Sequence, residues 1–184
     1  MKSTVNEKIV FFDLETKKLF SDVPGPRDPS KLGLAVAGIL IEDKHTFFEE
    51  DKVKDLFKAL DAADLIVGHN LLRFDYLVLQ PYTDFDVLEH YKKKTIDMHA
   101  HLENKTGKYL ALDHLAQMNI GMKKPFDGTL IPPLWNAGKH KEVKEYLLND
   151  LKMTKSVFLH GKNTKKLKYR DRDTGLTQDI IIDW

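Results

Sequence analysis

The sequence contains no cysteine among its 184 residues. This absence excludes a disulfide framework, a thiolate zinc site and a cysteine nucleophile. Long apolar runs are missing as well, since stretches such as Ile9 to Phe12 are far too short to span a bilayer. The amino terminus, residues 1–8, is polar and lacks the apolar block of a secretion signal. We therefore expect a cytoplasmic protein with no membrane segment.

No charge of either sign predominates, because 29 basic and 28 acidic residues leave a net charge of +1. The distribution is nevertheless uneven: residues 139–170 carry 10 Lys and Arg against 3 Asp and Glu. Such a segment could bind a polyanion. It is equally typical of the solvated face of a helix, so the charge pattern alone leaves both interpretations open.

The composition is that of one folded domain, with 42% hydrophobic and 10% aromatic residues. Apolar runs and alternation predict strands, and apolar residues at helical spacing predict helices. The first half is expected to form a strand over 8–15, a hairpin over 32–48, a helix over 51–62 and a strand over 65–68. A helix over 73–79, a strand over 95–97, helices over 110–118 and 141–160, and a hairpin over 165–184 are expected to follow. Prolines and glycines predict loops over 20–31 and 125–138. This order predicts an α/β fold with a mixed central sheet flanked by helices and a C-terminal β-hairpin.

Two acids, Asp13 and Glu15, stand at the carboxyl end of the first predicted strand. Side chains two residues apart in a strand lie on the same face. Charges at the end of a buried strand are costly unless they are paired or bind a metal. Hard cations such as Mg²⁺ prefer carboxylate oxygens, so the pair predicts a divalent-metal site. The alternative is a strand that simply emerges into solvent.

Asp75 ends the segment GHNLLRFD, which follows the predicted strand over 65–68. In open α/β sheets, sites lie beyond the carboxyl ends of the strands. Asp75 would therefore lie near the first acid pair if the two strands are parallel. In the alternative interpretation Asn70 caps a helix and Asp75 is a surface acid in its first turn.

Tyr146 and Asp150 are four residues apart in the longest predicted helix, so their side chains lie on one face. A carboxylate and a phenol in this arrangement could bind a metal and orient a water molecule. The alternative is a half-buried tyrosine beside a solvated acid.

The histidines His99 and His101 follow Asp97, and such a pair can bind zinc. The motif also occurs in amidohydrolases, but those carry it early in a (β/α)₈ barrel of typically ~250 residues, which this chain is too short to form. We interpret Asp97 as the acid that ends a third strand and the histidines as part of a helix face.

Taken in order, Asp13, Glu15, Asp75 and Asp150, with Tyr146 four residues before the last, resemble the pattern of the DEDD 3′–5′ exonucleases. The motifs are FDLET, HNLLRFD and YLLND. The chain resembles the tyrosine (DEDDy) form of the DnaQ-like branch of the ribonuclease H-like superfamily over about residues 8–160. The segment that begins at Trp135 also resembles exonuclease-like proteins fused to helicases or encoded near them. The histidine form is excluded, because Glu145 stands where it would carry histidine.

The resemblance implies a metal-dependent 3′–5′ exonuclease with two divalent ions, Mg²⁺ or Mn²⁺, about 3.5–4 Å apart. It implies that Asp13 bridges both ions, that Glu15 and Asp150 complete the ligands of the first, and that Asp75 serves the second. Tyr146 would orient the attacking water. Residues 1–161 would form this exonuclease domain, and residues 162–184 a hairpin extension packed on it.

The implied substrate is the 3′ end of single-stranded nucleic acid, DNA in preference to RNA, and a helicase or polymerase is a candidate partner. The resemblance assigns Asn70 and Thr16 to contacts with the terminal nucleotide. Phe74 is also among the residues assigned to the substrate, but we expect its ring to pack beneath the site rather than to stack on a base. Two alternatives remain, a non-catalytic module that binds nucleic acid or a helicase, and a structure-selective endonuclease. The basic tail either contacts phosphates or forms the outer face of a packed hairpin; its cations are Lys162, Lys165, Lys166, Lys168 and Arg170.

Overall fold

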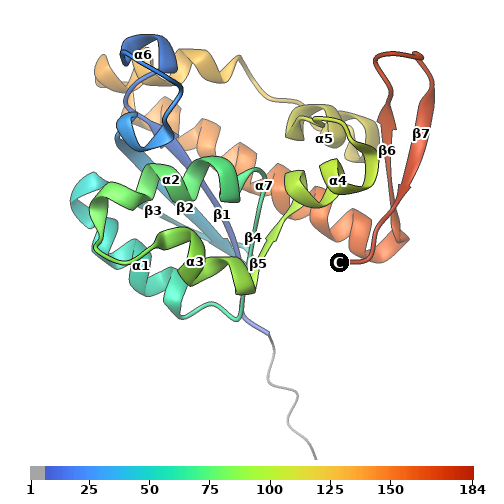
Figure 1. The fold of residues 1–184 in the computed structure, drawn as a ribbon, viewed down its shortest axis with the longest axis horizontal. Coiled ribbons are helices and arrows are strands. Elements are labelled where there is room, and N and C mark those ends of the chain that lie inside the picture. Colours follow the sequence, from blue (N-terminus) through green and yellow to red (C-terminus); the bar gives the residue numbers. More distant parts are fainter. Residues whose placement is uncertain (1–6) are drawn as a thin grey trace, which may run out of the picture.

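The computed structural model describes residues 7–184; residues 1–6, part of the polar amino terminus, lie outside it. Five strands form one sheet in the order β3-β2-β1-β4-β5 (Figure 1). Their bounds are β1 Ile9–Thr16, β2 Leu34–Ile41, β3 Lys44–Glu49, β4 Leu65–Gly68 and β5 Thr95–Asp97. All five strands were predicted from the sequence.

The sheet is mixed. β1 pairs in parallel with β4, and β4 pairs in parallel with β5. β2 is antiparallel to both β1 and β3. Because the three parallel strands share a direction, their carboxyl ends lie at one edge of the sheet. The sequence placed Asp75 near Asp13 and Glu15 only if the strands before them are parallel, and β1 and β4 are parallel.

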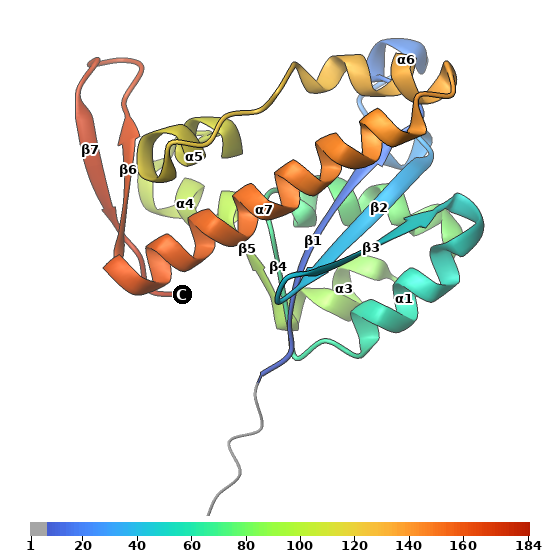
Figure 2. The same cartoon turned by 180° about the vertical axis from the view of Figure 1, so that it is seen from behind.

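Helices cover both faces of the sheet (Figure 2). Their bounds are α1 Val53–Asp61, α2 Tyr76–Leu79, α3 Val87–Tyr91, α4 Met98–Thr106, α5 Leu112–Ile120 and α7 His140–Thr164. Alternate residues of β1 enter two different cores: Val10 and Phe12 pack with α1, α2 and α3, whereas Phe11 packs with α7 and α5. Within residues 7–184, no helix is both long and apolar enough to cross a membrane.

The predicted loop over 125–138 is wrong in its second half. A 3₁₀ turn over Gly128–Leu130 leads into α6, Ile131–Asn136. Pro132 and Pro133 lie in the first turn of this helix, where the backbone N–H groups have no intrahelical partner and proline is tolerated. The prolines therefore begin a helix here, and the buried Trp135 fixes it to the core.

The predicted C-terminal hairpin is confirmed as β6, Lys166–Arg170, and β7, Thr177–Ile181. Leu167 and Tyr169 alternate with exposed residues and enter the same core as α5 and α7. Beyond β7, the indole Nε1 of Trp184 donates a hydrogen bond of 3.1 Å to the backbone oxygen of Phe158 in α7. The hairpin thus packs on α5 and α7, outside the central sheet.

Candidate active site

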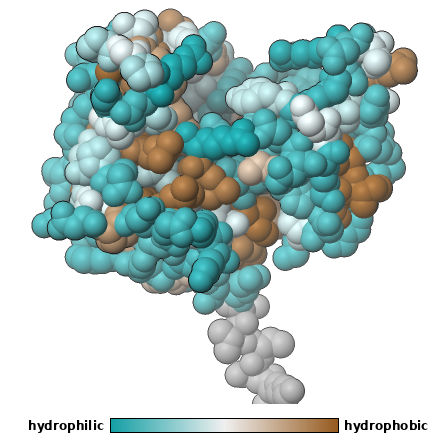
Figure 3. Space-filling model, in the orientation of Figure 1, coloured by the Kyte–Doolittle hydropathy of each residue, from teal (hydrophilic) through white to brown (hydrophobic). Residues whose placement is uncertain are grey.

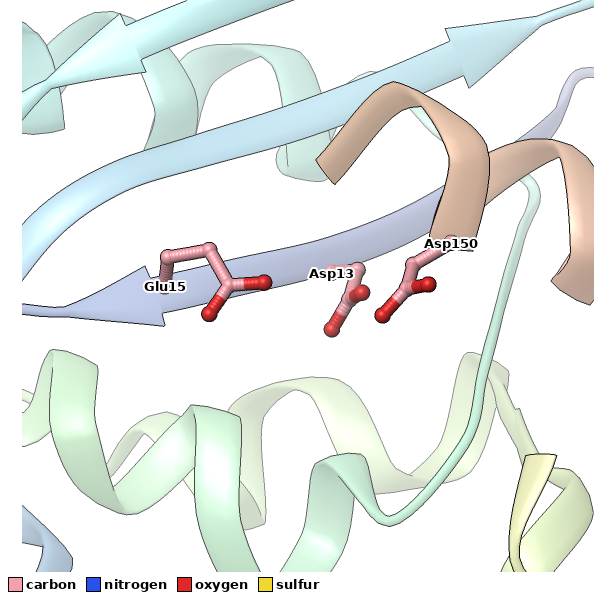
Figure 4. A group of neighbouring side chains, drawn as sticks. All are labelled: Asp13, Glu15 and Asp150. Atoms are coloured by element: carbon pink, nitrogen blue, oxygen red, sulfur yellow. The ribbon is translucent and has the colours of Figure 1, made fainter. Parts of the chain in front are cut away.

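Three acids, Asp13, Glu15 and Asp150, converge at one face of the sheet. One carboxylate oxygen from each lies within 4.8 Å of the others. Figure 4 shows the carboxyl groups of Asp13 and Asp150 side by side, with that of Glu15 turned toward Asp13. Within residues 7–184, this is the only group of three Asp, Glu or His side chains close enough to hold one metal ion.

The alternation of β1 and a close helix contact explain this convergence. Asp13 and Glu15 lie on the same face of β1 as Phe11, the face that α7 covers. Gly38 of β2 pairs with Asp13, and a Cβ atom at Gly38 would lie 2.8 Å from Cδ1 of Leu151. A side chain at that position would push α7 away from the sheet. Glycine therefore lets the helix pack closely enough to bring Asp150 to the strand.

Asp75 lies outside the group of three but close to it. It is 2% exposed and ends the π-helical turn Leu71–Asp75, which follows β4. Burial and the neighbouring Asp13 and Asp97 raise the pKa of its carboxyl well above the usual range. The alternative of a surface acid is therefore wrong.

Asp97, at the end of β5, holds the turn that carries Asp75. Its carboxylate accepts hydrogen bonds from the backbone N–H groups of Asn70 at 2.7 Å and Leu72 at 3.0 Å. The same carboxylate caps α4 by accepting from the N–H groups of His99 and Ala100. Asn70 itself adopts the left-handed conformation, with φ of +74°, and the hydrogen bond from its backbone N–H holds it there. One buried acid thus joins two elements at the carboxyl ends of neighbouring strands.

Lys124 is the residue that the sequence analysis missed. Its ammonium group donates a hydrogen bond to Asp150 and a second, of 3.0 Å, to the phenol oxygen of Tyr146. Burial alone would lower the pKa of this ammonium, but Asp150 and Tyr146 raise it above its usual value. The loop backbone is anchored as well, because the N–H of Lys124 donates to Asp113 at 2.6 Å. A side-chain cation therefore lies among the clustered acids.

The phenol of Tyr146 is neutral at physiological pH. Burial, followed by the charge of Asp150, raises its pKa to about 12. Since its oxygen accepts a hydrogen bond from Lys124, the phenolic hydrogen remains able to donate to a third group. Tyr146 is 2% exposed and lines the cleft beside the acids, so that third group would be a molecule in the cleft.

The acids disfavour one another's ionisation. Burial and then the charge of Asp150 raise the pKa of Asp13 to about 7, and Lys124 opposes this shift. Burial and the charges of Asp13 and Asp150 raise the pKa of Glu15 well above its usual range. The pKa of Asp150 is also raised, by burial, against the opposing effect of Lys124. Such a cluster favours the binding of positive charge.

The arrangement fits a hard divalent cation. All of the clustered donors are carboxylate oxygens, the type that Mg²⁺ and Mn²⁺ prefer. Oδ1 of Asp75 and Oδ1 of Asp150 are buried, and no hydrogen-bond donor among residues 7–184 reaches either atom. Unpaired buried oxygens are costly, so these two atoms lack a partner that a cation would supply.

A cleft of about 620 Å³ opens beside the acids and is lined by Asp13, Asp150 and Tyr146 together with His69 and Lys124. A second cavity, of about 190 Å³, lies beside Glu15. Gly128 lines both. The site is therefore open on two sides of the acid group.

Thr16 and Phe74, which the sequence analysis assigned to the substrate, line the smaller cavity. The hydroxyl of Thr16 donates to the backbone oxygen of Lys18 at 2.9 Å. Phe74 is half-buried, and its ring meets that of Phe20 edge to face at 6.1 Å. No ligand contact of either residue follows from these interactions, so their assignment stays a prediction.

The His99-x-His101 pair lies in α4, as predicted. His99 is buried against Tyr109, with ring centroids 4.7 Å apart. His101 Nε2 lies 3.0 Å from a carboxylate oxygen of Asp183. The two histidines form no group of three possible metal ligands within residues 7–184.

No protein-family model matches the chain, and no curated protein matches it. Among solved structures, it is similar to the family B DNA polymerase from the hyperthermophilic archaeon Pyrobaculum calidifontis, with a TM-score of 0.60 and 17% sequence identity. The match covers 86% of this chain and 24% of that polymerase, so the chain spans about a quarter of its length. At this identity the likeness concerns the fold. The mixed sheet with flanking helices is consistent with the ribonuclease H-like fold predicted from the sequence.

Proposed function

We propose that this protein is a metal-dependent 3′–5′ exonuclease that hydrolyses phosphodiester bonds at the 3′ end of single-stranded nucleic acid. The observation that carries the proposal is the convergence of Asp13, Glu15 and Asp150, with Asp75 close by, at the edge of the sheet where the parallel strands end. The likeness to about a quarter of a DNA polymerase, an enzyme that acts on nucleic acid, supports it.

The protein's own groups would divide the work. Asp13, Glu15 and Asp150 would hold one divalent ion, and Asp75 would hold a second together with Asp13. Bound Mg²⁺ or Mn²⁺ would supply Lewis-acid stabilisation of the charge that develops on the phosphoryl oxygens. The neutral phenol of Tyr146 would donate its hydrogen bond to the attacking water and so fix its direction.

The open faces of the site indicate how a strand would enter. The smaller cavity would take the terminal nucleotide beside Thr16 and Phe74, and the larger cleft would take the nucleotides that precede it. The turn held at Asn70 lies at the same edge of the sheet. We propose DNA as the preferred substrate, with RNA as the second, and a helicase or polymerase as a partner.

A second candidate function is a non-catalytic module that binds nucleic acid or a helicase. The pairing of Lys124 with Asp150 favours it, because an ammonium group beside the acids satisfies part of the charge that a metal would otherwise balance. The two functions make different demands on Lys124. In the exonuclease, Lys124 must release Asp150 or share it when a metal binds, whereas in the non-catalytic module Lys124 keeps Asp150 permanently.

Digestion of matched 5′-labelled single-stranded DNA and RNA with Mn²⁺ distinguishes these functions. The exonuclease yields a ladder that shortens from the 3′ end and disappears in Asp13→Ala and Asp150→Ala. The sugar that is preferred identifies the substrate. Asp51→Ala, which removes an exposed acid that lines neither cavity, serves as the control and should retain the ladder. Binding of both strands without cleavage would instead establish the non-catalytic module.

A further inference from the structure

A third cavity, of about 190 Å³, lies between α5 and the C-terminal hairpin. Its lining includes Lys108, His114, Arg170 and Arg172. It shares Tyr109 and Ala111 with the cleft beside the acids. The two cavities are therefore neighbours, and together they extend from Asp13 and Asp150 to the hairpin. Figure 3 shows the hollow between the part of the molecule that carries α6 and the part that carries the hairpin.

Tyr109 stands where the two cavities meet. It is 63% exposed, so much of its side chain is open to a ligand. Its ring is supported from within, since the ring of the buried His99 lies 4.7 Å away and that of His69 lies 5.5 Å from His99. A supported ring with an exposed surface is a stacking platform for nucleobases, because every base offers a π-face.

The charges beyond Tyr109 favour a polyanion. Lys108 donates hydrogen bonds of 2.7 Å to both acids of the hairpin turn, Asp171 and Asp173, and so offsets one of their two negative charges. Arg170 and Arg172 are exposed, and neither forms an ion pair with any of residues 7–184. The net charge of these side chains is therefore positive, and it rests on the two arginines.

The turn is also held in place. Asp171 is 5% exposed and accepts hydrogen bonds from the N–H groups of Asp173 at 2.9 Å and Thr174 at 3.4 Å. The backbone N–H of Arg170 donates to Nε2 of His114 in α5 at 3.0 Å. The arginines thus project from a fixed segment, which lowers the entropic cost of binding through them.

We propose that a single strand with its 3′ end at the carboxylates runs over Tyr109 and onto Arg170 and Arg172, so that the C-terminal hairpin is part of the strand-binding surface. This inference rests on the proposed function for the position of the 3′ end. Tyr109 stacks on a base of the strand, and the arginines bind phosphates farther from the 3′ end. The hairpin therefore makes affinity depend on strand length.

The test is fluorescence anisotropy of the full chain with 5′-labelled oligothymidylates of about 3 and about 12 nucleotides, in EDTA so that no cleavage occurs. We expect Tyr109→Ala, and the double variant Arg170→Ala/Arg172→Ala, to bind the longer strand at least tenfold more weakly than the unaltered chain. The arginine double variant should bind the shorter strand normally, because that strand is too short to reach the hairpin. Tyr109→Phe, which keeps the ring, should bind both strands normally.

The salt dependence separates phosphate contacts from a general loss of structure. The arginine double variant should reduce the slope of log affinity against log salt by roughly 1.4, since each contact with a single strand contributes about 0.7. The matched control is Lys54→Ala/Lys152→Ala, which removes the same charge from exposed positions outside the two cavities. It should leave the difference between long and short strands unchanged.

Equal affinities of all variants for the longer strand, or no binding of that strand by the unaltered chain, would overturn the inference. Cleavage with Mn²⁺ is scored separately. If the unaltered chain binds the long strand through Tyr109 but cuts neither strand, the proposed exonuclease fails, and with it the placement of the 3′ end, whereas the role of Tyr109 and the hairpin in strand binding stands. If it cuts both strands and the variants cut them equally well, the exonuclease stands and the inference fails.

Discussion

The ammonium group of Lys124 donates a hydrogen bond to the carboxylate of Asp150, one of the three clustered acids. This ion pair is largely buried, with Asp150 3% exposed. It partly balances a group of acids that would otherwise repel one another. A metal ion that binds Asp150 must displace this ammonium group or share the carboxylate with it. Lys124 therefore links the stability of the metal-free protein to its affinity for metal.

We predict that Lys124→Met destabilises the metal-free protein by about 2 kcal/mol, because it leaves the acid cluster without its cation. The same substitution should enlarge the rise in melting temperature that Mn²⁺ produces, because the competing ammonium group is gone. Thermal unfolding with EDTA and with Mn²⁺ measures both effects. Lys123→Met changes the exposed neighbour and should alter neither. An unchanged response to Mn²⁺ in Lys124→Met would show that the two cations do not compete.

Stability of the metal-free protein should depend on pH through Asp13. Its pKa is about 7 in the folded protein and near the ordinary 3.8 in the unfolded chain, so the folded state binds more protons between these values. The contribution of Asp13 to stability is therefore greatest below about pH 4, falls as the pH rises to about 7, and remains low above that. The loss should be about 2 kcal/mol, less than three pKa units would give, because water reaches the half-buried carboxyl.

Asp13→Asn tests this dependence. Urea unfolding in EDTA should show the variant to be more stable than the unaltered chain at pH 8 and similar to it at pH 4. Asp51→Asn removes an exposed acid and should leave the curve against pH unchanged. Parallel curves for Asp13→Asn and the unaltered chain would show that another group controls the pH dependence.

The close contact at Gly38 predicts a second effect on stability. Gly38→Ala would place a Cβ atom 2.8 Å from Leu151 and 3.1 Å from Leu147, so α7 must shift or the leucines must change rotamer. We expect a loss of about 2 kcal/mol and weaker Mn²⁺ binding, because Asp150 moves with the helix. In a double-mutant cycle, Gly38→Ala should cost less when Leu151→Ala has already removed the obstructing methyl groups. If the losses of stability in Gly38→Ala and Leu151→Ala simply add, the loss in Gly38→Ala does not come from contact with Leu151.

Most of the acid cluster could be predicted because each member follows a regular period. Alternation in a strand places Asp13 and Glu15 together, and helical spacing places Tyr146 beside Asp150. The parallel pairing of β1 with β4 then brings Asp75 to the same edge of the sheet. The order of the elements carried this information, since strands separated by helices favour parallel pairing.

Lys124 could not be predicted in this way. It lies between Gly121 and Asp127 in a loop, where no period relates a side chain to the core. Its position is set by the hydrogen bond from its backbone to Asp113, 11 residues earlier, a contact that follows neither the helical nor the strand period. For the same reason the prolines of α6 were misinterpreted. Pro132 and Pro133 are equally compatible with a loop and with the first turn of a helix, and the packing of Trp135 decides between them.

Asp97 provides the last prediction, since it positions Asp75 without belonging to the acid group. Its two oxygens accept hydrogen bonds from four backbone N–H groups, on the turn after β4 and at the start of α4. In Asp97→Asn the amide nitrogen would replace one oxygen, so a donor would face a backbone donor. We expect a loss of about 2 kcal/mol in urea unfolding and a lower affinity for Mn²⁺, because the turn that carries Asp75 is released.

Asp127→Asn is the matched control, because Asp127 caps a short 3₁₀ turn at an exposed position by accepting one hydrogen bond of 2.8 Å from the N–H of Thr129. Asparagine is nearly as good a cap as aspartate, so this variant should lose only a few tenths of a kcal/mol. If Asp97→Asn loses no more than Asp127→Asn, the carboxylate of Asp97 does not hold the turn. If it loses stability but binds Mn²⁺ normally, the turn keeps Asp75 in place without Asp97, and the positioning role is wrong.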